Sequence, residues 1–189
     1  DTGPYEVGTE ELTQASGSLQ PTFTNPDVAL GSQPSVVSVA DYMEVDWANI
    51  GQPVEVVVVG YYTSLAGTTL VGGIGITSSG IRIRHGGSGN WELVAQLGSG
   101  IGGGTPDTSK HLFRAVVNGA SSSLLIDESS VATGNPGANA ATGLTAFANG
   151  GGGSAMTGGI AFIGYKAGAL TAAERSDLHT WIQGHYGTP

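Results

Sequence analysis

Short apolar runs, separated by glycine-rich turns about every ten residues, dominate this sequence from Val36 onward. Runs of this length suit single strands and are too short for the helices of a domain. Glycine accounts for 33 of the 189 residues, about twice its ordinary share. Such a turn-rich sequence predicts an all-β fold, an antiparallel sandwich or barrel in one main domain.

Ten segments are predicted as strands: 35–39, 42–47, 54–61, 73–76, 81–84, 91–97, 111–118, 124–127, 144–147 and 159–165. Ile81 and Ile83 alternate with Arg82 and Arg84, which places the isoleucines inward and both guanidinium groups on the opposite face. Residues 54–59 are apolar on both sides apart from one glutamate, as in a central strand between two packed layers.

One helix is predicted, at the C-terminus. Thr171 and Glu174 form a capping box, in which each side chain satisfies a free backbone N–H at the start of the helix. An apolar face follows at spacings of three and four, made of Leu178, Trp181 and Ile182. Gly187 can end the helix, so we expect it over 172–185, with this face against the sandwich.

The N-terminal region has a different texture. Residues 1–35 contain five acidic residues, no basic ones, four prolines and no sustained periodicity. We therefore expect two parts: an arm or linker over residues 1–35, with one edge strand, and a folded domain over residues 36–189.

Charge and composition exclude several functions. With 15 acidic and 6 basic side chains the net charge is −9, which argues against nucleic acid as a partner because phosphate binding needs clustered Lys and Arg. No apolar run is long enough to insert into a membrane. The absence of cysteine removes disulfides, thiolate metal sites and cysteine nucleophiles.

The second half of the chain resembles a known family. The stretches HLFRAVVNGASSSLLIDESS, GLTAFANG and GGIAFIGYKAGALTAAERSDLHTWIQGHYG are similar to the concanavalin A-like, laminin G-like jelly-roll domains of phage virion and bacterial surface proteins. Residues 38–62 resemble the opening strands of these domains. The resemblance covers about residues 36–187. It implies a two-sheet antiparallel jelly-roll sandwich with one C-terminal α-helix, whose loops or concave face bind glycans or proteins, sometimes with calcium.

The same fold also carries glycosidases, whose signature is two carboxylates on one strand face. Glu44 and Asp46 share a face by the period of two, but Asn49 stands where these enzymes have a second glutamate. Asparagine cannot exchange a proton at neutral pH. Solvated strand residues are therefore favoured, with a glycosidase using Glu44 and Asp46 as the alternative.

A polysaccharide lyase is a second alternative on this fold. Residues 165–168, Tyr-Lys-Ala-Gly, resemble one lyase signature, but the arginine-glutamate and Gln-x-His strands of those enzymes are missing. A strand-to-helix connection is favoured here. Residues 98–103 match a dinucleotide-binding string, but no helix follows, so a glycine-rich loop is predicted.

The most suggestive binding segment runs from Arg84 to Trp91. It offers Arg84, His85, Asn90 and Trp91 around a loop of small residues, a set that suits sugar stacking and hydroxyl recognition. Tyr62 is a further aromatic candidate. In the alternative reading Trp91 packs inward and the glycines only turn the chain.

No metal-binding spacing is present in the sequence. A calcium ion would need oxygen ligands, for which Asp46, Asp107 and Asp127 are the candidates near turns. No other cofactor is expected.

Taken together, these features predict a non-catalytic virion-associated or extracellular β-sandwich. Its partners would be a host-surface glycan or other virion subunits, with no nucleic acid and no membrane insertion. The sequence leaves open whether it forms a homo-oligomer.

Overall fold

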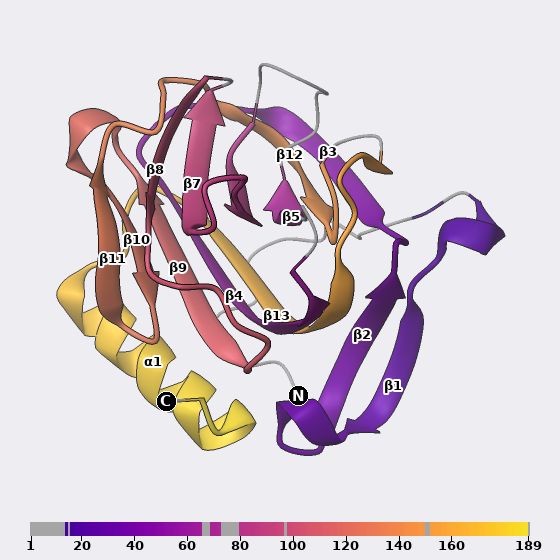
Figure 1. The fold of residues 1–189 in the computed structure, drawn as a ribbon. Helices are drawn as coiled ribbons and strands as arrows, with labels where there is room; N and C mark the ends of the chain where they lie inside the picture. Colours follow the sequence, from indigo (N-terminus) through magenta and orange to yellow (C-terminus); the bar gives the residue numbers. More distant parts are fainter. Residues whose placement is uncertain are drawn as a thin grey trace.

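The computed structural model describes residues 14, 16–65, 69–72, 80–96, 98–149 and 152–188, apart from the side chains of 47–49. These residues form two antiparallel sheets and one helix (Figure 1). One sheet has seven strands in the order β1-β2-β13-β4-β9-β10-β11, and the other has six in the order β3-β12-β5-β6-β7-β8. The predicted all-β, two-sheet sandwich with a C-terminal helix is confirmed.

The seven-stranded sheet consists of β1 (Thr22–Asp27), β2 (Gln33–Val39), β4 (Val54–Ser64), β9 (His111–Val117), β10 (Ser122–Ile126), β11 (Ser129–Gly134) and β13 (Thr157–Ala167). The six-stranded sheet consists of β3 (Met43–Ile50), β5 (Thr69–Gly72), β6 (Arg82–His85), β7 (Trp91–Gln96), β8 (Ser99–Gly103) and β12 (Ala141–Ala146). Three short 3-10 turns occur at Gly17–Leu19, Val28–Leu30 and Gly119–Ser121.

The central strand β4 is buried on both of its faces. It lies between β13 and β9, and its alternate valines serve two different layers. Val56 and Val58 pack into the core between the sheets, whereas Val57 and Val59 pack beneath the helix. A run of β-branched residues suits a strand covered on both sides.

The helix α1 (Ala172–Tyr186) covers the outer face of the seven-stranded sheet. Both hydrogen bonds of the predicted capping box are present, and Gly187 ends the helix with a φ of 59°. Leu178, Ile182 and Tyr186 are buried against the outward valines of β4. The outer face of the six-stranded sheet has no helix over it in the part of the chain that the structure describes.

A buried carboxylate ties the helix region to the sheet. Glu55 on β4 is 1% exposed and accepts a hydrogen bond from the Leu170 backbone N–H at 2.9 Å. The guanidinium groups of Arg114 and Arg175 lie 3.5 and 3.6 Å from its two oxygens. Arg114 also pairs with Glu128. The single charge in the apolar run of β4 is thus matched by partners from β9, from α1 and from the segment just before α1.

Most strand predictions correspond to strands of the structure. The predicted segment 73–76 lies outside the described residues. Strands β1, β5, β8 and β11 were not among the ten segments, although β1 is the edge strand expected in the N-terminal region. Because β2 begins at Gln33, the seven-stranded sheet includes residues that the division at residue 35 assigned to the arm. The role of residues 1–35 as an arm or linker stays a prediction.

The prediction for residues 98–103 was wrong, because Ser99–Gly103 forms strand β8 paired with β7. Its glycines hide the alternation that marks a strand, and they are needed where it passes close to β11. A Cβ atom at Gly103 would lie 1.9 Å from the Val131 carbonyl oxygen.

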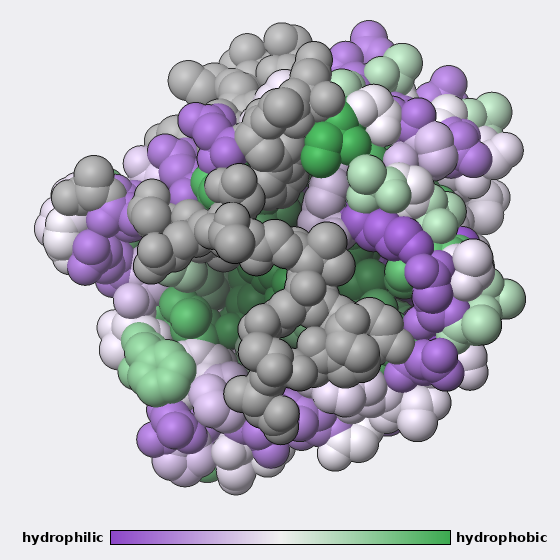
Figure 2. Space-filling view, turned by 180° about the vertical axis from the view of Figure 1, so that it is seen from behind, coloured by the Kyte–Doolittle hydropathy of each residue, from purple (hydrophilic) through white to green (hydrophobic). Residues whose placement is uncertain are grey.

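The surface seen from behind carries both hydrophobic and hydrophilic residues (Figure 2). Hydrophobic residues are visible near the middle of this face, and hydrophilic residues lie on both sides of them. Among the described residues, no helix is long and apolar enough to span a bilayer.

Candidate functional site

The outer face of the six-stranded sheet carries a cluster of polar side chains on β6 and β7. Ile83 is fully buried in the core, so the alternation along β6 turns Arg82 and Arg84 outward, as predicted. The register pairs Arg84 with Glu92 and Arg82 with Val94. Glu92 therefore stands directly across from Arg84 on the same face.

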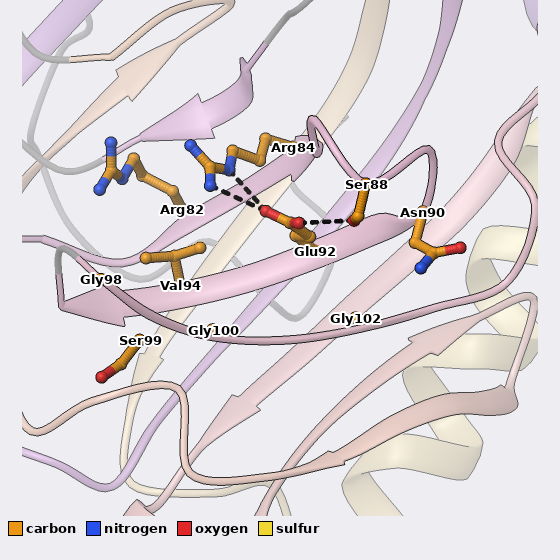
Figure 3. A pocket seen from close by; sticks show the side chains of 10 residues that line it. All are labelled: Arg82, Arg84, Ser88, Asn90, Glu92, Val94, Gly98, Ser99, Gly100 and Gly102. Carbon is orange, nitrogen blue, oxygen red and sulfur yellow. Dashed lines mark hydrogen bonds and ion pairs between the residues drawn. The ribbon is translucent and has the colours of Figure 1, made fainter.

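The Glu92 carboxylate is held in place by its neighbours (Figure 3). Arg84 Nε and one terminal nitrogen lie 2.9 and 2.8 Å from Glu92 Oε2. The Ser88 hydroxyl lies 2.9 Å from Glu92 Oε1. With two oxygens engaged, the carboxylate has a defined orientation before any ligand arrives.

The tight turn between β6 and β7 positions the end of this cluster. The Gly86 N–H donates to the Asn90 carbonyl at 2.9 Å, and the Gly89 N–H donates to the Gly86 carbonyl at 3.1 Å. Gly89 has a φ of 78°, a conformation that glycine adopts without strain. The turn brings Ser88 and Asn90 to the same side as Glu92.

Strand β8 completes a pocket of about 450 Å³. Its inward residue is Ile101, which packs in the core, and its outward residues are Gly100 and Gly102. One wall is therefore made of backbone. The pocket is lined by Arg82, Arg84, Ser88, Asn90, Glu92, Val94, Gly98, Ser99, Gly100 and Gly102.

The electrostatics of the pocket differ from those of the chain. Two guanidinium groups and one carboxylate leave it with net positive charge, whereas the whole chain carries −9. Burial, and then the nearby charge of Arg84, lower the pKa of Arg82. The lining combines fixed N–H donors, a carboxylate acceptor, an amide and hydroxyls, which suits a small, highly hydroxylated or charged ligand.

The structure brings two of the five predicted ligand residues to this pocket, Arg84 and Asn90. Trp91 and Tyr62 are only 2% and 1% exposed, and their rings pack together with centroids 5.3 Å apart. Neither is available to stack on a sugar, so the inward reading of Trp91 is the correct one. His85 follows Arg84 on the strand and so points to the opposite side of the sheet, with a buried Nδ1.

The alternative catalytic pair lies elsewhere on the same face. The inward packing of Met43 and Val45 turns Glu44 and Asp46 outward on β3. Strands β12 and β5 separate β3 from β6, a distance of about 14 Å at ordinary strand spacing. These two carboxylates do not line the pocket. The side chain of Asn49 lies outside the described residues.

The three calcium candidates do not converge. Asp107 and Asp127 bind opposite sides of the His111 ring, at 3.0 Å from Nε2 and 2.6 Å from Nδ1. Asp46 lies on the other sheet. Within the described ranges no group of three or more His, Asp or Glu could hold a metal ion. Calcium dependence stays a prediction, to be tested by binding with and without a chelator.

Among the pocket residues that were not predicted as ligand residues, four carry polar or charged side chains: Arg82, Ser88, Glu92 and Ser99. Glu92 could have been found, because a hairpin through the small-residue turn sets it across from Arg84. The same alternation groups Trp91 with Leu93 and Ala95, both fully buried. Ser99 carried no such signal because β8 was not recognised as a strand.

No family model matches this chain, and no curated protein matches it. Among solved structures, it is similar to domain 4 of an extracellular GH43 arabinanase from Geobacillus stearothermophilus in complex with arabinotriose, with 16% identity, a TM-score of 0.64, and 85% of this chain and 81% of that chain covered. It is also similar to the binding domain of botulinum neurotoxin DC in complex with rat synaptotagmin II. The identity there is 13% and the TM-score 0.63, and the match covers 92% of this chain and 47% of that chain. A third match is Trypanosoma rangeli sialidase, with 13% identity and a TM-score of 0.55, which covers 78% of this chain and 27% of that chain. The chain thus spans about a quarter of the sialidase and under half of the toxin structure. At these identities the likenesses show the fold, a two-sheet β-sandwich.

Proposed function

We propose that this protein is a non-catalytic carbohydrate-binding β-sandwich that works outside the cell, and that its glycan binds in the pocket between β6, β7 and β8. The observation that carries the proposal is the oriented Glu92 carboxylate, held by Arg84 and Ser88 at the centre of a polar pocket. Sugar hydroxyls both donate and accept hydrogen bonds, so they pair well with a carboxylate beside a guanidinium.

The dimensions of the pocket support this assignment. A volume of about 450 Å³ falls within the range of small-ligand sites, roughly 300–1,000 Å³. The backbone wall at Gly100 and Gly102 lets a sugar ring approach the main chain closely. Asn90 at one end and Ser99 at the other add hydrogen-bonding groups for the rest of the ligand.

The comparisons support a glycan ligand at the level of the fold. One similar structure is a domain in complex with arabinotriose. A place on a phage particle, where the same pocket would attach to host-surface glycan, stays a prediction from the family resemblance.

The enzyme alternative has weaker support. Glu44 and Asp46 lie outside the pocket, and Asn49 replaces the second glutamate of the glycosidase pattern. A screen of polysaccharides for released reducing ends tests this alternative. Turnover that disappears in Glu44→Gln would overturn the non-catalytic assignment.

The test is a glycan-array screen of the 189-residue chain, followed by calorimetry on the best glycan with and without EDTA. We expect Arg84→Ala and Asn90→Ala to weaken binding at least about 10-fold through lost hydrogen bonds. Lys166→Gln is the control, because it removes an exposed cation on β13 in the other sheet. Binding that survives both pocket variants would place the site elsewhere.

A further inference from the structure

Within the described part of the chain, one Lys or Arg side chain has no hydrogen-bond or ion-pair partner. The chain has six Lys and Arg residues, and all six are described. Five of them contact a carboxylate or a carbonyl oxygen: Arg84, Lys110, Arg114, Lys166 and Arg175. Arg82 has no hydrogen bond or ion pair within the described part of the chain. In so acidic a protein, an unpaired guanidinium marks an unusual position.

The surroundings of Arg82 make the missing partner costly. Its side chain is half-buried, it lines the pocket, and it stands two residues from a second guanidinium on the same face of β6. Removing a positive charge from water without a partner is unfavourable, and a neighbouring like charge adds to the cost. The nearest carboxylate of the pocket, Glu92, is already bound to Arg84 and Ser88. An anionic group of a ligand would offset this unfavourable free energy by pairing with Arg82.

We propose that the ligand of this pocket is a sugar that carries an anionic oxygen group, a carboxylate or a sulfate ester, and that Arg82 binds this group. The inference rests on the proposed function and narrows its ligand class. Figure 3 shows the Arg84 guanidinium turned toward Glu92, while that of Arg82 makes no drawn contact. The donors of Arg82 are therefore the ones left to pair with two anionic oxygens.

The arrangement also orients the ligand. Glu92 repels an anionic group and accepts from hydroxyls, so the charged end of the sugar faces Arg82. The hydroxyl-bearing part then lies toward Glu92 and Asn90. A neutral sugar would keep the hydroxyl contacts with Glu92 and Asn90 and would lack the contact of an anionic group with Arg82.

The experiment uses an array of matched glycans, each in a neutral, a carboxylated and a sulfated form. We expect anionic members to bind at least about 10-fold more tightly than their neutral parents, the scale of a charge-assisted hydrogen bond. The carboxylated and sulfated forms separate the two sources of negative charge. Arg82→Gln should remove this preference, and Arg82→Lys should retain part of it.

The control is again Lys166→Gln, which removes the same charge on the other sheet, and thermal melting confirms that each variant is folded. Neutral binding that Arg84→Ala weakens, without any anionic preference, would overturn this inference and leave the proposed function standing. An anionic preference that Arg82→Gln and Lys166→Gln reduce equally would also overturn it. No binding to any glycan would overturn both.

Discussion

The Glu92 carboxylate lies over Gly86, in the space where any other residue at position 86 would place its side chain. A Cβ atom at Gly86 would be 2.0 Å from Glu92 Cδ and 2.1 Å from Oε1. Because Gly86 has no side chain, the Glu92 carboxylate can occupy this space. This relationship couples the turn between β6 and β7 to the geometry of the pocket.

Gly86→Ala is predicted to displace the Glu92 carboxylate without removing any charge. The contacts of Glu92 with Arg84 and Ser88 would be broken, and we expect glycan affinity to fall about 10-fold, as for the loss of a charge-assisted hydrogen bond. Calorimetry on the best array glycan measures this. Gly87→Ala is the matched control, since a Cβ there would meet nothing within 4 Å. Equal affinity in the two variants would contradict the coupling.

Trp91→Ala is predicted to destabilise the fold. The indole is 2% exposed and packs against Phe113 with ring centroids 4.9 Å apart. Truncating a buried Trp leaves a cavity that costs about 3–5 kcal/mol. Urea unfolding gives the free energy. Its neighbour Asn90 serves as the comparison, because Asn90→Ala should change stability by no more than about 0.5 kcal/mol. Similar stabilities would argue against the inward position of Trp91.

Glu55→Gln is predicted to weaken the attachment of the C-terminal region. The amide oxygen can still accept from the Leu170 N–H, but the buried charge opposite Arg114 is lost. Breaking one side of a buried ion pair costs roughly 3 kcal/mol. Arg175 has a side chain that is 38% exposed, so Arg175→Ala should cost under about 1 kcal/mol. Chemical denaturation of both variants gives the comparison, and the reverse order would contradict the prediction.

Through His111, stability is predicted to fall as the pH rises above 6.5, the ordinary pKa of histidine. The hydrogen bond that the His111 ring donates to the Asp127 carboxylate is the largest cause that raises the pKa of His111 above 6.5, although burial of the ring lowers it. A raised pKa in the folded state stabilises fully below pH 6.5, and this contribution disappears as the pH rises through the folded value. Asp107 acts in a separate, acidic window, since its pKa is lowered from 3.8.

The measurement is the free energy of unfolding between pH 5.5 and 8.5 for the natural chain and for His111→Gln. The glutamine keeps a polar side chain but does not titrate in this range, so its curve should lack the decline. Two parallel curves would contradict the prediction, because they would show that the protonation of His111 does not contribute to the pH dependence of stability.

The fold was largely predictable because strong local patterns agreed with the final packing. The alternation at Ile81 and Ile83 correctly placed both arginines outward, and the capping box at Thr171 marked the start of the helix. Strand β8 could not be predicted in the same way. Glycines supply no alternation, and its pairing with β7 depends on backbone groups that every residue has.

The site was predictable only in part, for a related reason. Loop composition drew attention to residues 84–91, yet it treated Trp91 as a surface group, although the alternation through Leu93 and Ala95 marks it as inward. The role of Arg82 depends on which other cations have partners. That pairing is set by tertiary contacts such as those of Arg114 and Glu55, which lie far apart in sequence.

The backbone wall of the pocket at Gly100 and Gly102 has a consequence for how ligand preference can diverge among relatives of this protein. Main-chain groups are the same for every amino acid, and the strand has little room for larger side chains, since a Cβ at Gly102 would lie 3.1 Å from the Trp91 carbonyl oxygen. Substitutions of Gly100 or Gly102 would close the pocket and would not change which ligand it prefers. New specificities would therefore have to arise on β6 and in its turn to β7, while the backbone wall on β8 stays the same.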